Sequence, residues 1–195
     1  MANVDAPRGL VPLKMLGDKY ETAGFSTYKL ASGYTSNLFN GTAVELNAAT
    51  GTVIIATDDI SASAKILGVA GGVSYTDSTG KPVWKNMWTA STTTKGSVDA
   101  DIKVYDDPDQ LFVVQADGAV AQANVGENAP MTGNANGNTT NGISSMELDF
   151  SALAAASDQL RVIGFVQDPN NTAGSTNVDV IVRINSHAYT NLAGI

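Results

Sequence analysis

Short stretches in which apolar and polar residues alternate, or in which apolar residues run together, cover most of the chain beyond residue 24. Because successive side chains of a strand point to opposite faces, alternation predicts strands with one buried face, and short apolar runs predict strands buried on both faces. The predicted strands are residues 25–31, 42–48, 51–57, 64–75, 82–90, 101–107, 111–117, 145–150, 161–168 and 178–185.

The segments between these strands are rich in turn residues. Residues 106–110 (DDPDQ) and 169–177 (PNNTAGSTN) predict turns, because Asp, Asn, Gly and Pro favour bent backbone. Residues 132–142 (TGNANGNTTNG) predict an exposed loop with nothing that enters a core. A helix of about three turns is predicted over residues 151–160, which are rich in Ala and begin with Ser151, a suitable N-cap.

This pattern predicts an all-β fold: an antiparallel β-barrel or sandwich with one short helix and an extended N-terminal arm. Residues 25–195 are expected to form a single β-rich domain, and residues 1–24 the arm, whose prolines and glycines interrupt any helix. Five of the seven residues in 10–16 (LVPLKML) are apolar. That composition favours an arm docked on its own domain or on a neighbour, with a frayed terminus as the alternative.

The glycines of residues 67–72 (LGVAGG), followed by Gly80 and Lys81, raise the question of a phosphate-binding loop. Such a loop requires Gly where this chain has Tyr75, and a hydroxyl residue where it has Pro82. No helix pattern follows, and the dinucleotide-binding glycine spacing is also missing. The sequence therefore argues against a nucleotide site in this segment.

The same segment is instead expected to form two strands joined by a turn at residues 77–80 (DSTG). In the second strand, alternation assigns two faces: Val83, Lys85 and Met87 on one, and Trp84, Asn86 and Trp88 on the other. Both Trp side chains are expected in the core, with a subunit interface as the alternative.

The sequence contains few of the residue types that carry catalysis. The chain has no Cys and a single histidine, His187, which is expected at the surface or as a structural hydrogen-bond donor. Residues 98–109 (VDADIKVYDDPD) hold five aspartates, but the spacing of a calcium-binding EF-hand loop is missing. These aspartates are expected to line a solvated edge and turn. We expect no enzyme, with no catalytic, metal or cofactor-binding residues.

The net charge and the hydropathy of the chain limit the classes of partner that we expect. The net charge of −8 disfavours binding to the phosphates of nucleic acids and is compatible with docking on a basic protein surface. No apolar run is long enough to span a membrane, and residues 1–14 lack the apolar stretch of a signal peptide. We expect a soluble protein made in a cytoplasm, with no nucleic-acid or membrane partner.

Four ordered stretches carry a family resemblance: MANVDAPRGLVPLK, ILGVAGGVSYTDSTGKPVWKNMW, DIKVYDDPDQLFVVQADG and SMELDFSALAAASDQLRVIGFVQDPNNTAG with the later VDVIVRINSHAY. Together they span nearly the whole chain. They resemble the capsid decoration proteins of tailed bacteriophages, small β-rich virion proteins also called cement or stabilising proteins. The resemblance rests on general sequence character and not on a catalytic signature.

The resemblance implies a structural virion protein that binds the outer surface of the capsid, with the major capsid protein as partner, and stabilises the shell. It implies synthesis in the host cytoplasm and a homo-oligomer, for which we expect a trimer before a dimer. The alternative is a head-fibre or tail-associated surface-binding (adhesin) module, with residues 132–142 as its variable tip. Residues expected to contact the capsid or another subunit are Pro7, Arg8, Leu10, Val11, Pro12 and Leu13.

Overall fold

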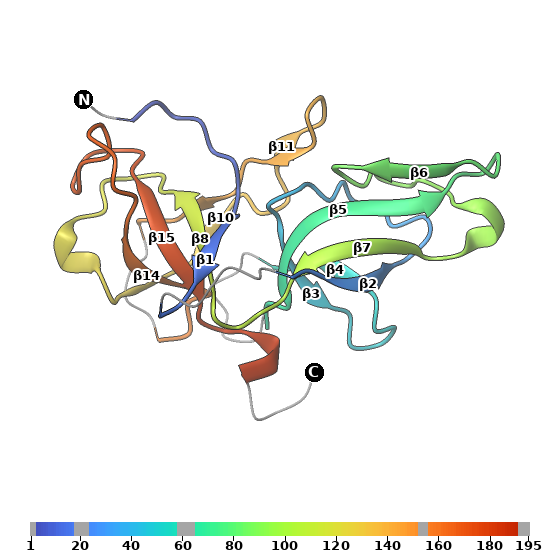
Figure 1. Cartoon of the computed structure of the whole chain (residues 1–195), viewed down its shortest axis with the longest axis horizontal. Helices are drawn as coiled ribbons and strands as arrows, with labels where there is room; N and C mark the ends of the chain where they lie inside the picture. Colours follow the sequence, from blue (N-terminus) through green and yellow to red (C-terminus); the bar gives the residue numbers. More distant parts are fainter. Residues whose placement is uncertain (1–2, 18–23, 58–64, 152–155, 191–195) are drawn as a thin grey trace.

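Two antiparallel sheets, one of five strands and one of six, dominate the computed structural model across the residues it describes: 3–17, 24–57, 65–151 and 156–190. The sheets form two lobes side by side along the long axis of the molecule (Figure 1). The described residues contain no helix of seven or more residues. The predicted all-β fold is therefore confirmed, in a sandwich-like form without a closed barrel.

The strands of the first lobe are β1 (Val11–Met15), β8 (Gln110–Gln115), β9 (Asn128–Ala129), β14 (Leu160–Phe165) and β15 (Asp179–Ile184). Those of the second lobe are β2 (Ser26–Leu30), β3 (Ala43–Leu46), β4 (Val53–Ile55), β5 (Gly68–Thr76), β6 (Pro82–Lys85) and β7 (Ala100–Tyr105). Two small sheets are formed by β10 (Met131–Thr132), β11 (Gly137–Asn138), β12 (Ile143–Ser144) and β13 (Glu147–Leu148). Single 3₁₀ turns are η1 (Lys95–Ser97), η2 (Gln122–Asn124) and η3 (Ala188–Thr190).

The five-stranded sheet has the order β1-β8-β15-β14-β9, so the N-terminal strand lies at its edge. The six-stranded sheet has the order β2-β7-β5-β3-β4, and β6 pairs with the far half of β5. Its two outer strands, β2 and β4, contact each other without a hydrogen-bonded ladder, because the sheet is strongly curled. In the small sheets β10 pairs with β13, whose Met131 and Leu148 pack in the core of the first lobe, and β11 pairs with β12.

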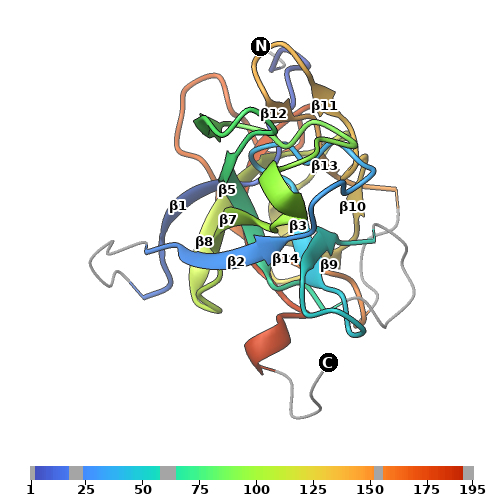
Figure 2. The same ribbon diagram turned by 90° about the vertical axis from the view of Figure 1, so that its right-hand side faces the viewer.

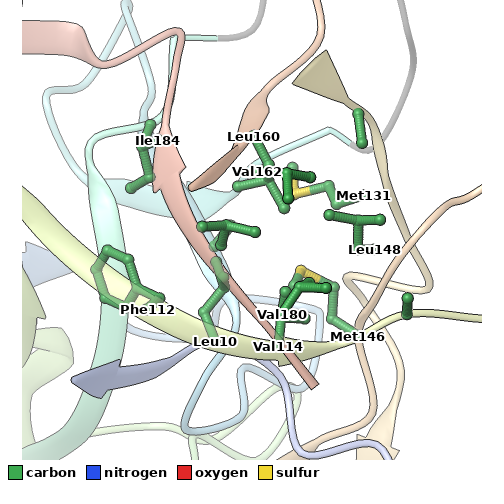
Figure 3. Close-up of a cluster of buried hydrophobic side chains, with 14 of the residues drawn as sticks. Leu10, Phe112, Val114, Met131, Met146, Leu148, Leu160, Val162, Val180 and Ile184 are labelled. Carbon is green, nitrogen blue, oxygen red and sulfur yellow. The ribbon is translucent and has the colours of Figure 1, made fainter. Parts of the chain in front are cut away.

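Each lobe has its own apolar core. The first core is built from β8, β14 and β15 together with β10 and β13. Figure 3 shows side chains that converge in it, among them Leu10, Phe112, Met146, Leu160, Val180 and Ile184. The second core surrounds the fully buried Trp88.

Strands β3 and β5 serve both cores. Ala43 lies in the first core and Val44 in the second, and the same switch occurs from Val69 to Ala70. The reason is the alternation of side chains along a strand, which places one face of each strand in each core. Strands β3 and β5 therefore separate the two cores and belong to both lobes, and we call them the shared wall.

The hairpin predicted around residues 77–80 is present: β5 and β6 pair antiparallel, and Gly80 donates a backbone hydrogen bond to the Asp77 carbonyl. The Asp77 carboxylate accepts hydrogen bonds from the backbone amides of Thr79 and Lys81. The Thr79 hydroxyl, which donates to the same carboxylate at 2.6 Å, and then these amides hold the pKa of Asp77 below its usual range. The backbone amides of Thr79, Gly80 and Lys81 are thus used within the turn, where all three donate to Asp77.

Two local predictions were wrong. Residues 132–142 are not simply an exposed loop, because Asn134 and Gly142 are buried. The Asn134 side chain accepts a hydrogen bond from the Ala43 amide at 2.9 Å and donates to the carbonyls of Ala43 at 2.9 Å and Ala56 at 2.8 Å. Asn134 can therefore be buried because its side-chain amide is hydrogen-bonded to backbone groups of two neighbouring segments.

The second wrong prediction is the helix of about three turns over residues 151–160. Residues 152–155 lie outside the described residues, but Leu160 is the first residue of β14 and Ser157 lies in a turn. Leu160 pairs with Ala129 and Ile184 on either side, so sheet pairing and burial fix the last residue of the predicted helix as a strand residue.

Candidate interaction surface

The N-terminal segment predicted to be a docking arm lies on the first lobe. Leu10 is 1% exposed and sits in the core, and its amide donates a hydrogen bond to the Gly41 carbonyl at 2.9 Å. The preceding residue, Gly9, has a φ of +68° and passes so close to the Gly41 loop that a Cβ would lie 2.6 Å from the Gly41 oxygen. A glycine at this position is required by both the backbone conformation and the available space.

Residues before Gly9 are hydrogen-bonded to the same end of the five-stranded sheet. The Ala6 amide donates to Gln115 Oε1 at 2.8 Å, and Gln115 Nε2 donates to the Val4 carbonyl at 3.1 Å. Further out, Asn3 Nδ2 donates to Asn171 Oδ1 at 2.7 Å. These bonds hold the segment against its own domain while the Val4 side chain remains 81% exposed.

Arg8 is positioned by an ion pair. Its Nη2 lies 2.8 Å from Asp179 Oδ2 in β15, and the two side chains are 41% and 19% exposed. An ion pair this open to water contributes at most about 1 kcal/mol to stability. Its main effect is to fix the direction of the guanidinium, which keeps part of its surface available to a partner.

Strand β1 follows as the edge strand, with a bulge between Pro12 and Lys14 that takes Leu13 out of the regular ladder. Pro12 carries no backbone donor, which is compatible with an edge position. Val11 is 37% exposed and faces outward opposite Val113, which in turn pairs with Ile181 of β15. Apolar side chains of three strands therefore lie in one row, of which Val11 is exposed, Ile181 half-buried and Val113 buried at 7% exposure.

The six predicted contact residues thus differ in how far their side chains are exposed to solvent. Leu10 is enclosed in the core of its own chain, so its side chain does not reach the surface. Pro7, Arg8, Pro12 and Leu13 are half-buried, and Val11 is exposed. We define the N-terminal surface as the exposed Val4 and Val11, with the half-buried Arg8 and Ile181 beside them.

Ile181 was not among the predicted contact residues. The alternation in residues 178–185 contains the signal that would have found it, because Asp179, Ile181 and Arg183 share the face opposite to Val180 and Val182. What the sequence does not give is the register that brings Ile181 level with Val113 and Val11.

An acidic group lies next to the N-terminal surface. Burial raises the pKa of Glu147 in β13, and the nearby carboxylates of Asp5 and Asp117 raise it further. Asp5 belongs to the same N-terminal segment as Val4 and Arg8, so negative charge borders the exposed apolar residues. This arrangement suits a partner surface that carries basic groups.

The two Trp residues differ, contrary to the prediction that both face the core. Strand β6 ends at Lys85, so the alternation that would place them on one face is interrupted before Trp88. Trp88 is fully buried and its Nε1 donates to the Tyr34 carbonyl at 3.0 Å. Trp84 is 59% exposed and its ring lies over Gly72, where a Cβ would come within 3.1 Å of it.

The tip of the β11–β12 hairpin is a second exposed feature. Residues 138–141 are exposed, and Asn86 Nδ2 donates to the carbonyl of Asn141, within this tip, at 3.0 Å. Figures 1 and 2 both show this hairpin on the side of the molecule that carries residues 3–9, away from η3. The N-terminal segment and the hairpin are therefore presented in the same direction.

His187 is buried and not a surface residue, and its Nδ1 accepts a hydrogen bond from the Tyr189 amide at 3.1 Å. Burial lowers the pKa of His187, against an opposing effect of the Asp106 and Asp107 carboxylates. The Asp106 carboxylate also accepts a hydrogen bond from the Tyr28 hydroxyl at 2.6 Å, and burial together with this bond raises the pKa of Tyr28. These groups connect β2, β7 and η3.

The aspartates of residues 98–109 are used in separate local contacts. Asp101 pairs with Lys29 at 2.5 Å, Asp106 binds Tyr28, and Asp109 pairs with Arg183 at 3.1 Å. Across the described part of the chain, no three His, Asp or Glu side chains gather as a set of metal ligands. Nor does any described helix have the length and apolarity to cross a membrane.

Comparison with known proteins adds no relative: no family model, no curated protein and no solved structure matches the chain.

Proposed function

We propose that this protein is a structural virion component that binds the outer surface of a bacteriophage capsid and stabilises the shell, and that it is not an enzyme. The observation that carries the proposal is the N-terminal surface: exposed Val4 and Val11 beside the partly exposed Arg8, on a segment already held in place by Leu10. The resemblance of the sequence to capsid decoration proteins supports the same role.

The physical argument concerns the cost of ordering a docking segment. A disordered arm loses conformational entropy when it binds, whereas a segment fixed to its own sheet has already paid this cost on folding. Val4, Val11 and Ile181 would bury apolar surface against the major capsid protein, and Arg8 would bind a capsid carboxylate. Many identical sites on the shell would then act together through avidity.

Self-association belongs to the same proposal. We expect a homo-oligomer, a trimer before a dimer, located where capsid subunits meet. Sedimentation equilibrium of the purified protein measures this directly: a mass of one chain across the micromolar range would contradict it.

The decisive experiment is electron microscopy of capsids incubated with the purified protein. We expect regular density on the outer shell with the wild type, and loss of that density with Val11→Asp. The matched control is Val125→Asp, because Val125 has the same 37% exposure as Val11 and lies outside the N-terminal surface. Density that persists with Val11→Asp would exclude the N-terminal surface as the contact, and no density with the wild type would overturn capsid binding itself.

A tail-associated or head-fibre adhesin is the second candidate, and the exposed tip at residues 138–141 favours it. Such a tip is easily varied because it contributes nothing to either core. Density on the tail or on fibres of intact virions, with none on the shell, would support this function over capsid stabilisation.

A further inference from the structure

Two arginines lie directly opposite each other on neighbouring strands of the first lobe. Arg161 of β14 is the register partner of Arg183 of β15. Side chains in such cross-strand positions have Cβ atoms about 5 Å apart, and like charges there repel. This pairing brings together two of the three arginines of a chain whose net charge is −8.

Neighbouring groups hold both guanidinium groups from the side. Arg161 Nε donates to Asn128 Oδ1 at 2.9 Å. Arg183 Nε donates to the Pro108 carbonyl at 2.8 Å, and its Nη2 to Asp109 Oδ1 at 3.1 Å. Each Nε is therefore used for positioning.

Both guanidinium groups keep N–H donors that form no hydrogen bond to the described residues. Within the residues that the structure describes, Arg161 forms no ion pair, and its hydrogen bonding involves Nε alone, which leaves both terminal amino groups. Arg183 uses Nε and Nη2, which leaves Nη1. The two side chains can thus offer several N–H donors to a ligand between them.

A pocket of about 210 Å³ lies at this position, lined by Arg161, Arg183, Ile184, Asn185 and Thr190. We propose that it binds a small oxoanion, a phosphate or a carboxylate, between the two guanidinium groups. Guanidinium groups bind both kinds of oxoanion through paired N–H···O bonds, and the anion would neutralise the repulsion across the strands. Asn185 is fixed beside the pocket by donating from Nδ2 to the Asp158 carbonyl at 2.9 Å.

This site does not depend on the proposed capsid role. Arg161 and Arg183 are separate from Val4 and Val11, so either proposal can fail while the other holds. The ligand could be free phosphate or a carboxylate carried by another protein, because both have the same donor requirements.

The test is titration of the full-length protein with sodium phosphate and, separately, with sodium acetate, followed by NMR of the arginine Nε–H signals at constant ionic strength. We expect saturable shifts at Arg161 and Arg183, and at least about tenfold weaker binding by Arg161→Gln. Arg161→Lys keeps the charge without the planar fork and should bind with intermediate strength. Lys81→Gln removes one charge from the exposed hairpin turn and should bind like the wild type.

The outcomes separate clearly. Saturable shifts with either salt support the site, and the salt that binds more tightly identifies the source of the oxoanion. Absence of saturation with both salts, or equal weakening by Arg161→Gln and Lys81→Gln, would overturn the proposal. Arg161 is exposed, so its replacement should leave the fold intact, and an unchanged amide spectrum in the absence of ligand checks this.

Discussion

At the scale of single residues, the crossing of Gly9 and Gly41 decides how the N-terminal segment lies on the molecule. Both have positive φ, +68° and +89°, and each passes close to the backbone of the other segment. A Cβ on Gly41 would lie 2.9 Å from the Arg8 carbonyl. The chain can therefore bring Leu10 into the core only because two glycines meet at the crossing.

Replacing Gly9 with Ala should destabilise the fold by about 3 kcal/mol or more, since the positive φ costs about 1–3 kcal/mol and the clash adds to it. Gly17→Ala is the matched control: its φ is +80°, but no atom of the described residues lies within 4 Å of an added Cβ. It should cost only the backbone strain, about 1–2 kcal/mol. Urea unfolding measures both, and equal losses for the two variants would refute the close crossing.

His187 should make stability depend on pH. Its folded-state pKa is lowered by burial from an unfolded value of 6.5, so at pH values below 6.5 the unfolded chain binds a proton that the folded chain does not. The free energy of unfolding should therefore fall as pH decreases from about 7 towards the folded-state pKa.

The measurement is urea unfolding of the wild type and of His187→Asn between pH 7 and 5. Asn retains an acceptor near the position of Nδ1 for the Tyr189 amide but does not titrate. Glu45 and Glu147, whose pKa values are raised by burial, stabilise the fold on protonation and act in the opposite direction in both proteins. We expect the wild type to lose more stability than the variant on acidification, and parallel pH profiles would show that His187 is not responsible.

At the scale of elements, the strands were predictable and their exceptions have physical causes. Alternation located residues 26–30, 100–105 and 179–184 because those strands bury one face. It failed at residues 132–142, where the buried Asn134 is hydrogen-bonded to the backbone of Ala43 and Ala56, and at residues 86–88, where β6 has already ended. A polar residue that enters a core through hydrogen bonds leaves no apolar signal in the sequence.

The candidate site was only partly predictable for a related reason. The sequence pointed to residues 7–13 because apolar residues cluster there, but composition does not tell which of them face inward. The structure separates Leu10, in the core, from Val11, at the surface, through the pairing of β1 with β8. Ile181 joined the surface only once the strand register was known.

That separation gives a prediction for the N-terminal strand. Leu10→Ala should cost about 2–5 kcal/mol, because it leaves a cavity in the first core. Val11→Ala should cost less than about 1 kcal/mol, because the side chain is already 37% exposed. Capsid binding should respond in the opposite order, weakened by Val11→Ala and, per folded molecule, unaffected by Leu10→Ala. Thermal unfolding and co-sedimentation with capsids measure the two effects.

At the scale of the whole molecule, the question is whether two lobes with two cores behave as one domain. Their shared wall argues that they do. Ile66 and Val69 pack in the first core, while Leu67 and Ala70, their neighbours in sequence, pack in the second. Unfolding either lobe would therefore expose one face of β5 and remove the support of its other face.

We predict a single cooperative unfolding transition. Native-state hydrogen exchange offers one buried strand residue in each lobe: Val182 in β15 and Ile102 in β7 should exchange with the same opening free energy. Leu160→Ala, which makes a cavity in the first core alone, should lower both values by the same amount, about 2–5 kcal/mol. Lys81→Gln, on the exposed turn, should change neither. If the variant lowered only the value at Val182, the lobes would unfold independently, and the shared wall of β3 and β5 would not couple them.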